Sequence, residues 1–176
     1  MIKILKDPSK SNFPVEISIS HTKVQFNCRN TILVSKLIDG IFPDYRIFIP
    51  EKSIGTLLID RKILIDVVDR ISTVTSDNFR AVQFSVNETA IEVSAHGNSA
   101  TKAKEVLEYI ESEELTINYK GLNFTRSFNP TYLMDILSTV SSKNIEIHFG
   151  YNDQTPTLIK EEGEEHSLFV VMPLIG

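Results

Sequence analysis

Few residues in this sequence have the type and spacing that catalysis or metal binding requires. Four histidines are the first candidates: His21, His96, His148 and His166. Their separations match no metal site, and none belongs to a recognisable catalytic triad or phosphate-binding loop. Asp39 and Asp44 also lack a base or metal partner near them in the sequence. We therefore expect no catalytic residue, no metal and no cofactor, while a small hydrolase assembled in space from these groups stays an alternative.

The single cysteine has a structural interpretation. Cys28 cannot form an internal disulfide, and it continues the alternating run Val24, Phe26, Cys28, which is typical of a half-buried strand. This usage fits a reducing cytoplasm. Residues Met1 to Lys6 are too short and too charged for a signal peptide or a membrane span. We expect a cytoplasmic protein without a membrane partner.

One segment has the chemistry of binding rather than catalysis. It runs from Ser35 to Pro50 and reads SKLIDGIFPDYRIFIP. Pro43 and Pro50 fix φ and lack an N–H, which excludes a helix interior and a central strand at those positions. The large apolar residues of this connector are Phe42, Tyr45, Phe48 and Ile49. So apolar a connector must pack on something, and we expect the function of the chain to be read from this segment.

The composition restricts the class of partner. In 176 residues, 41% are hydrophobic and 23% charged, as in an ordinary soluble globular protein. The formal net charge of −5 argues against a classical nucleic-acid binder with a clustered basic surface. Any contact with DNA should therefore be weak or topological. The acidic run from Glu161 to Glu165 is most simply a solvated hairpin loop, and it is assigned no site.

Two hydrophobic periods alternate along the chain. Alternation of apolar and polar residues predicts half-buried antiparallel strands. The apolar members of these runs are Val15/Ile17/Ile19, Val24/Phe26/Cys28, Val82/Phe84/Val86, Ile91/Val93/Ala95, Leu115/Ile117/Tyr119, Leu122/Phe124 and Ile145/Ile147/Phe149. Helical spacing appears twice, in Ile63, Leu64, Val67, Val68, Ile71 and in Tyr132, Leu133, Ile136, Leu137, Val140.

The two helical segments form an internal repeat. The differences 132 − 63 and 140 − 71 both equal 69, and the intermediate members are displaced equally. Asp60 precedes the first segment, and Asn129 with Pro130 precedes the second, as N-terminal signals of helices. Residues 54–176 thus predict two similar strand–helix–strands units, with their helices side by side on a shared, curved antiparallel sheet. For Ala103 to Glu114, helix propensity and a continued sheet stay alternative predictions.

The connector, read with the terminal FVVMPL of Phe169 to Leu174, resembles the bacterial DNA polymerase sliding clamp, the β subunit. The resemblance covers nearly the whole chain but only the last part of the family's length. It implies an α+β DNA-clamp fold, with a partial second clamp domain and linker in residues 1–50 and a complete C-terminal domain in residues 51–176. On this reading the first domain and the start of the second are missing, so the chain alone should be a monomer or aggregate that does not stay on circular DNA.

Position by position, the resemblance implies a groove for partner peptides. Its residues would be Pro43, Ile47, Phe48, Tyr132, Pro156, Val170, Met172, Pro173 and Leu174. Such side chains suit an apolar slot for short disordered segments of the Gln-Leu-x-Leu-Phe type. Without the resemblance, Phe48, Val170 and Met172 would be interpreted as plain core. The chain also departs from the family, because it ends in Ile175 and Gly176 where a basic residue is common.

Two further surfaces follow from the resemblance. The ring interface of the family would involve Thr73, Val74, Ser99, Lys102 and Lys104, although two solvated lysines that guard an edge strand are an equally good reading. The surface that faces DNA would include Lys62, Arg70 and Lys143, in a pattern that also describes any solvated helix face.

The function implied is that of a non-catalytic processivity factor. Such a clamp encircles duplex DNA as a homodimeric ring and tethers the catalytic subunit of DNA polymerase III and the clamp loader through their peptide motifs. The alternative is a freestanding peptide-binding module derived from the clamp's last domain, without a role on DNA.

Overall fold

The structure is a computed structural model, and it describes residues 14–41, 43–75, 80–97, 101–164 and 167–175. Phe42 and Ser99 lie outside the described residues. The chain separates into two compact units, residues 1–44 and 45–176, and each is described by itself. Pro43 belongs to the first unit, whereas the remaining predicted groove residues belong to the second. No helix within the described ranges is long and apolar enough to cross a membrane.

The first unit contains one antiparallel sheet in the order β1-β2-β3. Its strands are β1 (Glu16–Ile19), β2 (Lys23–Cys28) and β3 (Thr31–Lys36). Phe26 pairs with Ile17 on one side and with Leu33 on the other. Only β2 is half-buried, however, because Ile17 is 56% exposed and Ile19 is 73% exposed. The expectation of half-buried strands is therefore wrong for β1, whose apolar side chains remain largely open to solvent.

The second unit begins with a short 3₁₀ helix and continues with alternating strands and helices. In chain order its elements are η2 (Tyr45–Phe48), β4 (Ser53–Asp60), α2 (Arg61–Ser72), β5 (Val82–Val86), β6 (Ala90–His96), β7 (Lys102–Glu108), β8 (Ile110–Glu111), β9 (Thr116–Gly121), β10 (Phe124–Phe128), α3 (Pro130–Thr139), β11 (Asn144–Gly150), β12 (Thr157–Glu161) and β13 (Leu168–Val171). The predicted run from Leu122 is shorter than expected, since Leu122 precedes β10 and is 66% exposed.

The strands of the second unit form two antiparallel sheets, which replace the single shared sheet that the sequence suggested. One has the order β10-β5-β6-β7, and the other has the order β13-β12-β11-β4-β9-β8. The strand before each helix pairs with the strand that follows the other helix, since β4 pairs with β11 and β10 pairs with β5. Each sheet therefore contains strands from both repeats, which gives the unit its pseudo-two-fold organisation.

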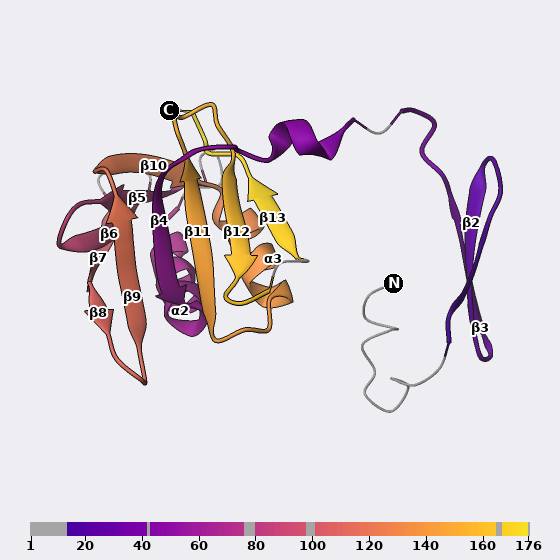
Figure 1. Cartoon of the computed structure of the whole chain (residues 1–176), viewed down its shortest axis with the longest axis horizontal. Helices are drawn as coiled ribbons and strands as arrows, with labels where there is room; N and C mark the ends of the chain where they lie inside the picture. The colour runs from indigo at the N-terminus through magenta and orange to yellow at the C-terminus, as the bar shows by residue number, and fades with distance from the viewer. Residues whose placement is uncertain (1–13, 42, 76–79, 98–100, 165–166, 176) are drawn as a thin grey trace. The chain divides into compact units, whose positions relative to one another are not determined.

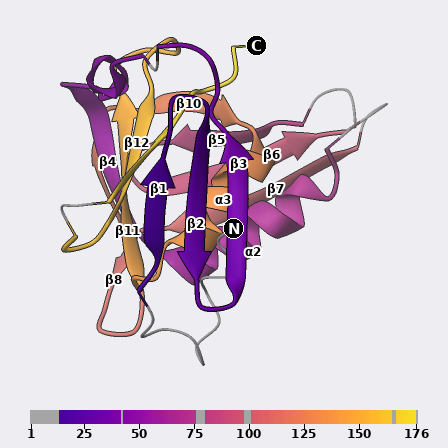
Figure 2. The same cartoon turned by 90° about the vertical axis from the view of Figure 1, so that its right-hand side faces the viewer.

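Both helices lie on one side of the six-stranded sheet. Figure 1 shows β9, β4, β11, β12 and β13 side by side, with α2 and α3 behind them. The quarter turn in Figure 2 places β5, β6 and β7 on that same side. The helices pack against each other and bury Leu64, Val67, Val68, Ile71, Leu133 and Leu137. These side chains join the core formed by inward residues of both sheets, as the helical spacing predicted.

The predicted start signals cap both helices. The side chain of Asp60 accepts hydrogen bonds from the backbone N–H groups of Lys62 and Ile63, at 2.8 and 3.3 Å. The side chain of Asn129 accepts one from Thr131 N at 2.9 Å, and Pro130 occupies the first turn. Each cap satisfies donors that have no partner within the helix.

The segment from Ala103 to Glu114 is extended rather than helical. Its first half, residues 103–108, belongs to β7, which pairs with β6 from Ala90↔Glu108 to His96↔Lys102. Ala103 and Leu107 pack partly on the core, while Lys104 and Val106 between them face solvent. This ladder and the half-buried face outweigh a helix propensity that amounts to a few tenths of a kcal/mol per residue.

Candidate functional site

The edge strand β13 presents an apolar row to solvent. It is the outermost strand of the six-stranded sheet, and within the described residues its ladder partner is β12. Phe169 and Val171 turn inward, and Val171 is 4% exposed. On the opposite face, Leu168, Val170 and Met172 are 39%, 36% and 49% exposed. Because side chains alternate across a strand, these three form one continuous outward row.

The tail after β13 crosses from one sheet to the other. Thr157 pairs with Val171, which places the preceding Pro156 beside the start of the tail. Further along, Leu174 N donates a hydrogen bond to Ser127 O of β10 at 2.8 Å. Pro173, which lies between Val171 and Leu174 in the tail, is buried. The structure thus brings together five predicted groove residues at this corner: Pro156, Val170, Met172, Pro173 and Leu174.

The other predicted groove residues within the second unit are exposed apolar groups on α3 and η2. Tyr132 lies in α3, which packs against β13, and its side chain is 59% exposed. Ile47 and Phe48 lie in η2 and are 73% and 44% exposed. The interpretation of Phe48, Val170 and Met172 as plain core is therefore wrong, since none of the three is buried.

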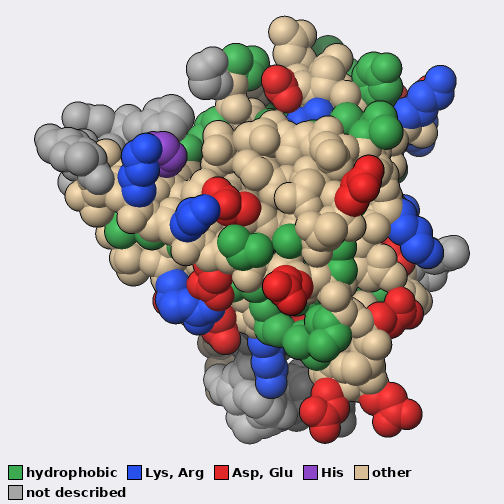
Figure 3. Space-filling model, turned by 90° about the vertical axis from the view of Figure 1, so that its left-hand side faces the viewer, with side chains coloured by type: hydrophobic (Ala, Val, Ile, Leu, Met, Phe, Trp, Pro, Cys, Tyr) green, Lys and Arg blue, Asp and Glu red, His purple; other side chains and the backbone are tan. Residues whose placement is uncertain are grey.

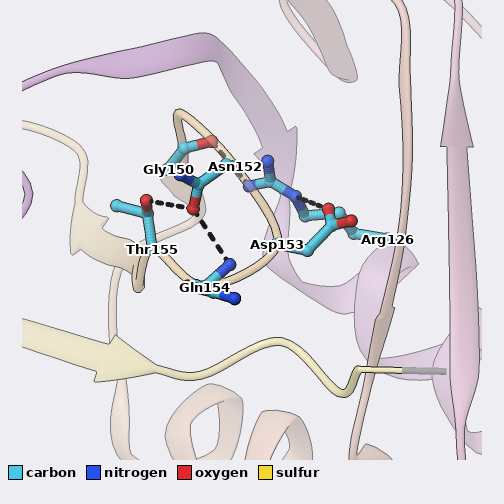
Figure 4. Close-up of polar contacts among 6 residues, drawn as sticks. All are labelled: Arg126, Gly150, Asn152, Asp153, Gln154 and Thr155. Carbon is cyan, nitrogen blue, oxygen red and sulfur yellow. Dashed lines mark hydrogen bonds and ion pairs between the residues drawn. The ribbon is translucent and has the colours of Figure 1, made fainter.

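Arg126 of β10 is a residue of this corner that sequence reasoning missed. Its side chain is only 3% exposed, which is rare for a charged residue. Nη1 donates to Gly150 O at 2.6 Å, and Nε donates to Asp153 Oδ1 at 3.3 Å. Figure 4 shows these contacts with the loop that carries Pro156. One feature of the sequence could have revealed this residue. Arg126 alternates with Phe124 and Phe128, so a charged side chain shares the apolar, inward face of the strand.

A hollow of about 500 Å³ lies against the same loop. It is lined by Glu51 and Lys52, which follow the connector, and by Tyr151 and Thr155 of the loop. The end of the connector therefore lies next to the 150–156 loop within the second unit.

Two of the predicted interface residues, Lys102 and Lys104, lie on an edge strand of the four-stranded sheet. β7 is the edge strand there, and it carries Lys102 and Lys104, whose side chains face solvent. Lys104 Nζ forms an ion pair with Glu92 Oε2 at 3.0 Å. Thr73 caps the end of α2, and Val74 packs partly on the core.

The predicted DNA-facing cations are partly engaged within the chain. Arg70 makes two hydrogen bonds to the Glu105 carboxylate, at 2.7 and 3.2 Å, and the bonding to Glu105 raises the pKa of Arg70. Lys143 Nζ donates to Glu113 O at 2.9 Å, whereas Lys62 is exposed at the start of α2. On the face shown in Figure 3, acidic and basic side chains are mixed rather than gathered by sign. No strongly basic surface covers that face.

One histidine has close polar neighbours that its sequence spacing did not reveal. His148 Nδ1 lies 3.1 Å from Thr56 Oγ1, and Nε2 lies 3.1 Å from Glu146 Oε2. Thr56 and His148 are directly opposed in the β4–β11 ladder. Such cross-strand pairs stabilise a sheet, which gives this cluster a structural explanation.

Comparison with known proteins identifies the family. Residues 46–175 match the family described as DNA polymerase III beta subunit, C-terminal domain. The beta sliding clamp of Rickettsia bellii is 42% identical over 176 residues, which are 99% of this chain and 46% of that protein. The beta sliding clamp of Caulobacter vibrioides is 30% identical, over 91% of this chain and 41% of that protein. The chain thus spans less than half the length of these relatives.

Solved structures support the same fold. The DNA polymerase sliding clamp from Pseudomonas aeruginosa has a TM-score of 0.83 at 21% identity, covering 98% of this chain and 44% of that one. A sliding clamp from Bartonella birtlesii, crystallised bound to griselimycin, has a TM-score of 0.79 at 28% identity, covering 92% of this chain and 41% of that one. The chain therefore belongs to the family of the DNA polymerase III beta subunit, the bacterial sliding clamp, and residues 46–175 are its C-terminal domain.

Proposed function

We propose that this chain acts as part of a sliding clamp that binds peptide segments of the replicative polymerase and the clamp loader. The observation that carries the proposal is the outward apolar row of Leu168, Val170 and Met172, beside a tail fixed to β10. An exposed apolar row next to polar surface is what a docking site for a short apolar peptide requires. Family membership supplies the partner class.

The site would bind a peptide through its shape and its apolar surface, without a covalent or catalytic step. Met172 has a flexible thioether side chain that can adapt to different Leu and Phe side chains. Pro156 and Pro173 restrict the backbone on both sides of it, so little ordering is needed on binding. Tyr132, Ile47 and Phe48 would complete the apolar walls. The chain would have no catalytic role, and its effect would come from holding the polymerase near its primer end at high effective concentration.

Contact with DNA would be topological. The net charge of −5 and the engaged side chains of Arg70 and Lys143 favour weak, non-specific contact with the duplex over tight binding. Enclosure by a ring would then keep the clamp on DNA without sequence readout, with the exposed Lys62 at the start of α2 facing the duplex.

The ring would close through β7. An edge strand offers unpaired backbone groups to a strand of another protomer. Val106 is 52% exposed on this strand and would add apolar contact, while Lys102 and Lys104 would require carboxylates opposite them. Thr73, Val74 and Ser99 would extend the same interface.

A peptide titration tests the proposal. A fluorescent peptide of the Gln-Leu-x-Leu-Phe type is titrated with the chain and followed by anisotropy. The double variant Phe48→Ala plus Met172→Ala should abolish saturable binding. Val106→Ala is the matched control, because Val106 is similarly exposed but lies on the distant strand β7. Saturable binding that only the double variant loses supports the proposal, whereas a folded chain that binds no peptide contradicts it.

A further inference from the structure

Arg126 is a charged group in the interior of the second unit. It lies at an inward position of β10, and its side chain is 3% exposed. Burying a guanidinium is unfavourable unless its donors are paired. Here the pairing is specific, because Nη1 bonds to Gly150 O at 2.6 Å and Nε bonds to Asp153 Oδ1 at 3.3 Å. The guanidinium carbon also lies 5.5 Å from the ring centre of Phe124. Both hydrogen-bond partners, Gly150 and Asp153, belong to the 150–156 loop.

That loop is closed on itself and would move as one piece. Asn152 Oδ1 accepts from Gln154 N at 3.0 Å and from Thr155 Oγ1 at 2.7 Å, and Thr155 N donates to Asn152 O at 3.0 Å. At Gly150, an added Cβ would lie 2.5 Å from Pro156 O, so the two ends of the loop approach closely. Figure 4 shows this compact loop with Arg126 at its base. Fixing Gly150 and Asp153 therefore fixes Pro156 as well.

The next residue of β10 holds the tail. Ser127 O accepts the hydrogen bond from Leu174 N at 2.8 Å. Consecutive residues of one strand thus hold the loop through a side chain and the tail through the backbone. Pro156 stands at the end of the loop, and Met172 stands on the tail beside it. The Thr157–Val171 pair holds the end of the loop beside the tail, and β10 adds a second link between the two elements.

We propose that Arg126 is a positioning residue of the peptide site, one that sets the separation between the 150–156 loop and the tail without touching the peptide itself. The proposal rests on the proposed function. Without the guanidinium, Gly150 O and Asp153 lose this donor, and residues 151–155 can shift relative to the tail while Thr157 stays paired with Val171. A looser site must be ordered again on binding, which lowers affinity.

The test compares Arg126 with an arginine of similar bonding elsewhere in the unit. Arg61 donates from Nε to Ser142 O and from Nη1 to Leu137 O, both at 3.1 Å, and so ties the 141–143 turn to the end of α3. Arg126→Met and Arg61→Met each remove one guanidinium with two such bonds. Arg126→Lys keeps the charge but can replace only one directed donor, and Asp153→Ala removes only the exposed ion-pair partner. All variants are tested as the full chain.

Two readouts separate positioning from general stability. In peptide titrations, Arg126→Met should weaken binding about tenfold, Arg126→Lys and Asp153→Ala less, and Arg61→Met not at all. In amide hydrogen exchange, Arg126→Met should speed exchange in residues 151–155 and at Leu174, while Arg61→Met should speed it near Ser142 only. If Arg126→Met does not fold, Arg126→Lys and Asp153→Ala still allow the comparison.

Each outcome decides between the two proposals. A wild-type chain that binds no peptide refutes the proposed function, and the exchange data alone then judge the positioning role of Arg126. Unchanged exchange in the loop and at Leu174 in folded Arg126 variants overturns that role. Equal loss of peptide affinity in the Arg61 and Arg126 variants also overturns it, because affinity would then follow stability rather than loop position.

Discussion

Two adjacent residues, Val171 and Met172, have opposite predicted roles. Val171 is 4% exposed and packs in the core, whereas Met172 is 49% exposed on the outward side of the tail. Full burial of an apolar side chain of this size stabilises by about 1.5–3 kcal/mol. For Met172 about half of that burial remains for a bound peptide to supply, which corresponds to about 1 kcal/mol and about a fivefold change in Kd.

Alanine at each position should therefore change a different quantity. Met172→Ala should raise the peptide Kd about fivefold while lowering the free energy of unfolding by at most about 1 kcal/mol. Val171→Ala removes two methyl groups from a packed interior and leaves a cavity, so it should lower the free energy of unfolding by about 2 kcal/mol. Its peptide Kd should remain that of the wild type, because Val171 faces away from the peptide.

The assay combines urea unfolding, followed by circular dichroism, with the anisotropy titration at a urea-free condition where both variants are folded. The reasoning is refuted if Val171→Ala weakens peptide binding as much as Met172→Ala does. It is also refuted if Met172→Ala destabilises the fold by about 2 kcal/mol or more, since Met172 would then be a core residue.

Four further changes test the physical reading of the fold. Asp60→Ala should lower the free energy of unfolding by about 1 kcal/mol in urea titrations, because two N–H groups at the start of α2 lose their acceptor. Thr157→Val should raise it by about 1 kcal/mol, since the buried Thr157 hydroxyl has no partner among the described residues. Burial raises the pKa of Tyr109 to about 12 from 10, so its contribution to stability is complete below pH 10 and is lost as pH rises toward 12; Tyr109→Phe should flatten that alkaline loss. Hydrogen bonds from the backbone N–H groups of Ser142 and Ser141 lower the pKa of Glu161, so its contribution is present above the ordinary carboxyl pKa of 4.5 and is lost as pH falls through the lowered value; Glu161→Gln should reduce the acid sensitivity of unfolding.

Each of these has a contrary outcome. A neutral Asp60→Ala would mean that the start of α2 does not depend on its cap. A destabilising Thr157→Val would show that the hydroxyl has a partner, such as water. If Tyr109→Phe keeps the wild-type alkaline profile of stability, that sensitivity belongs to other groups. The same holds for the acid profile of Glu161→Gln.

The periodic parts of the fold could be predicted from the sequence. Both helices, their caps and most strands follow from local spacing, because each element has one buried face. The repeat displacement of 69 holds through the helices but not beyond them. β5 begins ten residues after α2 ends (82 − 72), whereas β11 begins five residues after α3 ends (144 − 139). Connection length leaves no periodic signal.

The non-local features could not be predicted in the same way. β7 is a strand because β6 pairs with it, although its composition favours a helix. One of the two strand exchanges between the repeats, β4 with β11, depends on pairing across more than 80 positions, as in Thr56 with His148. Arg126 was missed because its partners, Gly150 and Asp153, are distant in sequence. The groove residues on β13 were assigned only by resemblance, since alternation alone does not tell which face of an edge strand is covered.

Methyl NMR of the chain with the Gln-Leu-x-Leu-Phe peptide tests the central claim most directly, because it locates the bound peptide. We predict saturable shifts for the methyl groups of Met172, Val170 and Leu174, with none for Leu64 in the buried face of α2 or for the exposed Val106 on β7. Shifts that centre on Val106 or on the helices, with Met172 and Val170 unchanged, would contradict the assignment of the peptide site to the β13 edge and the tail.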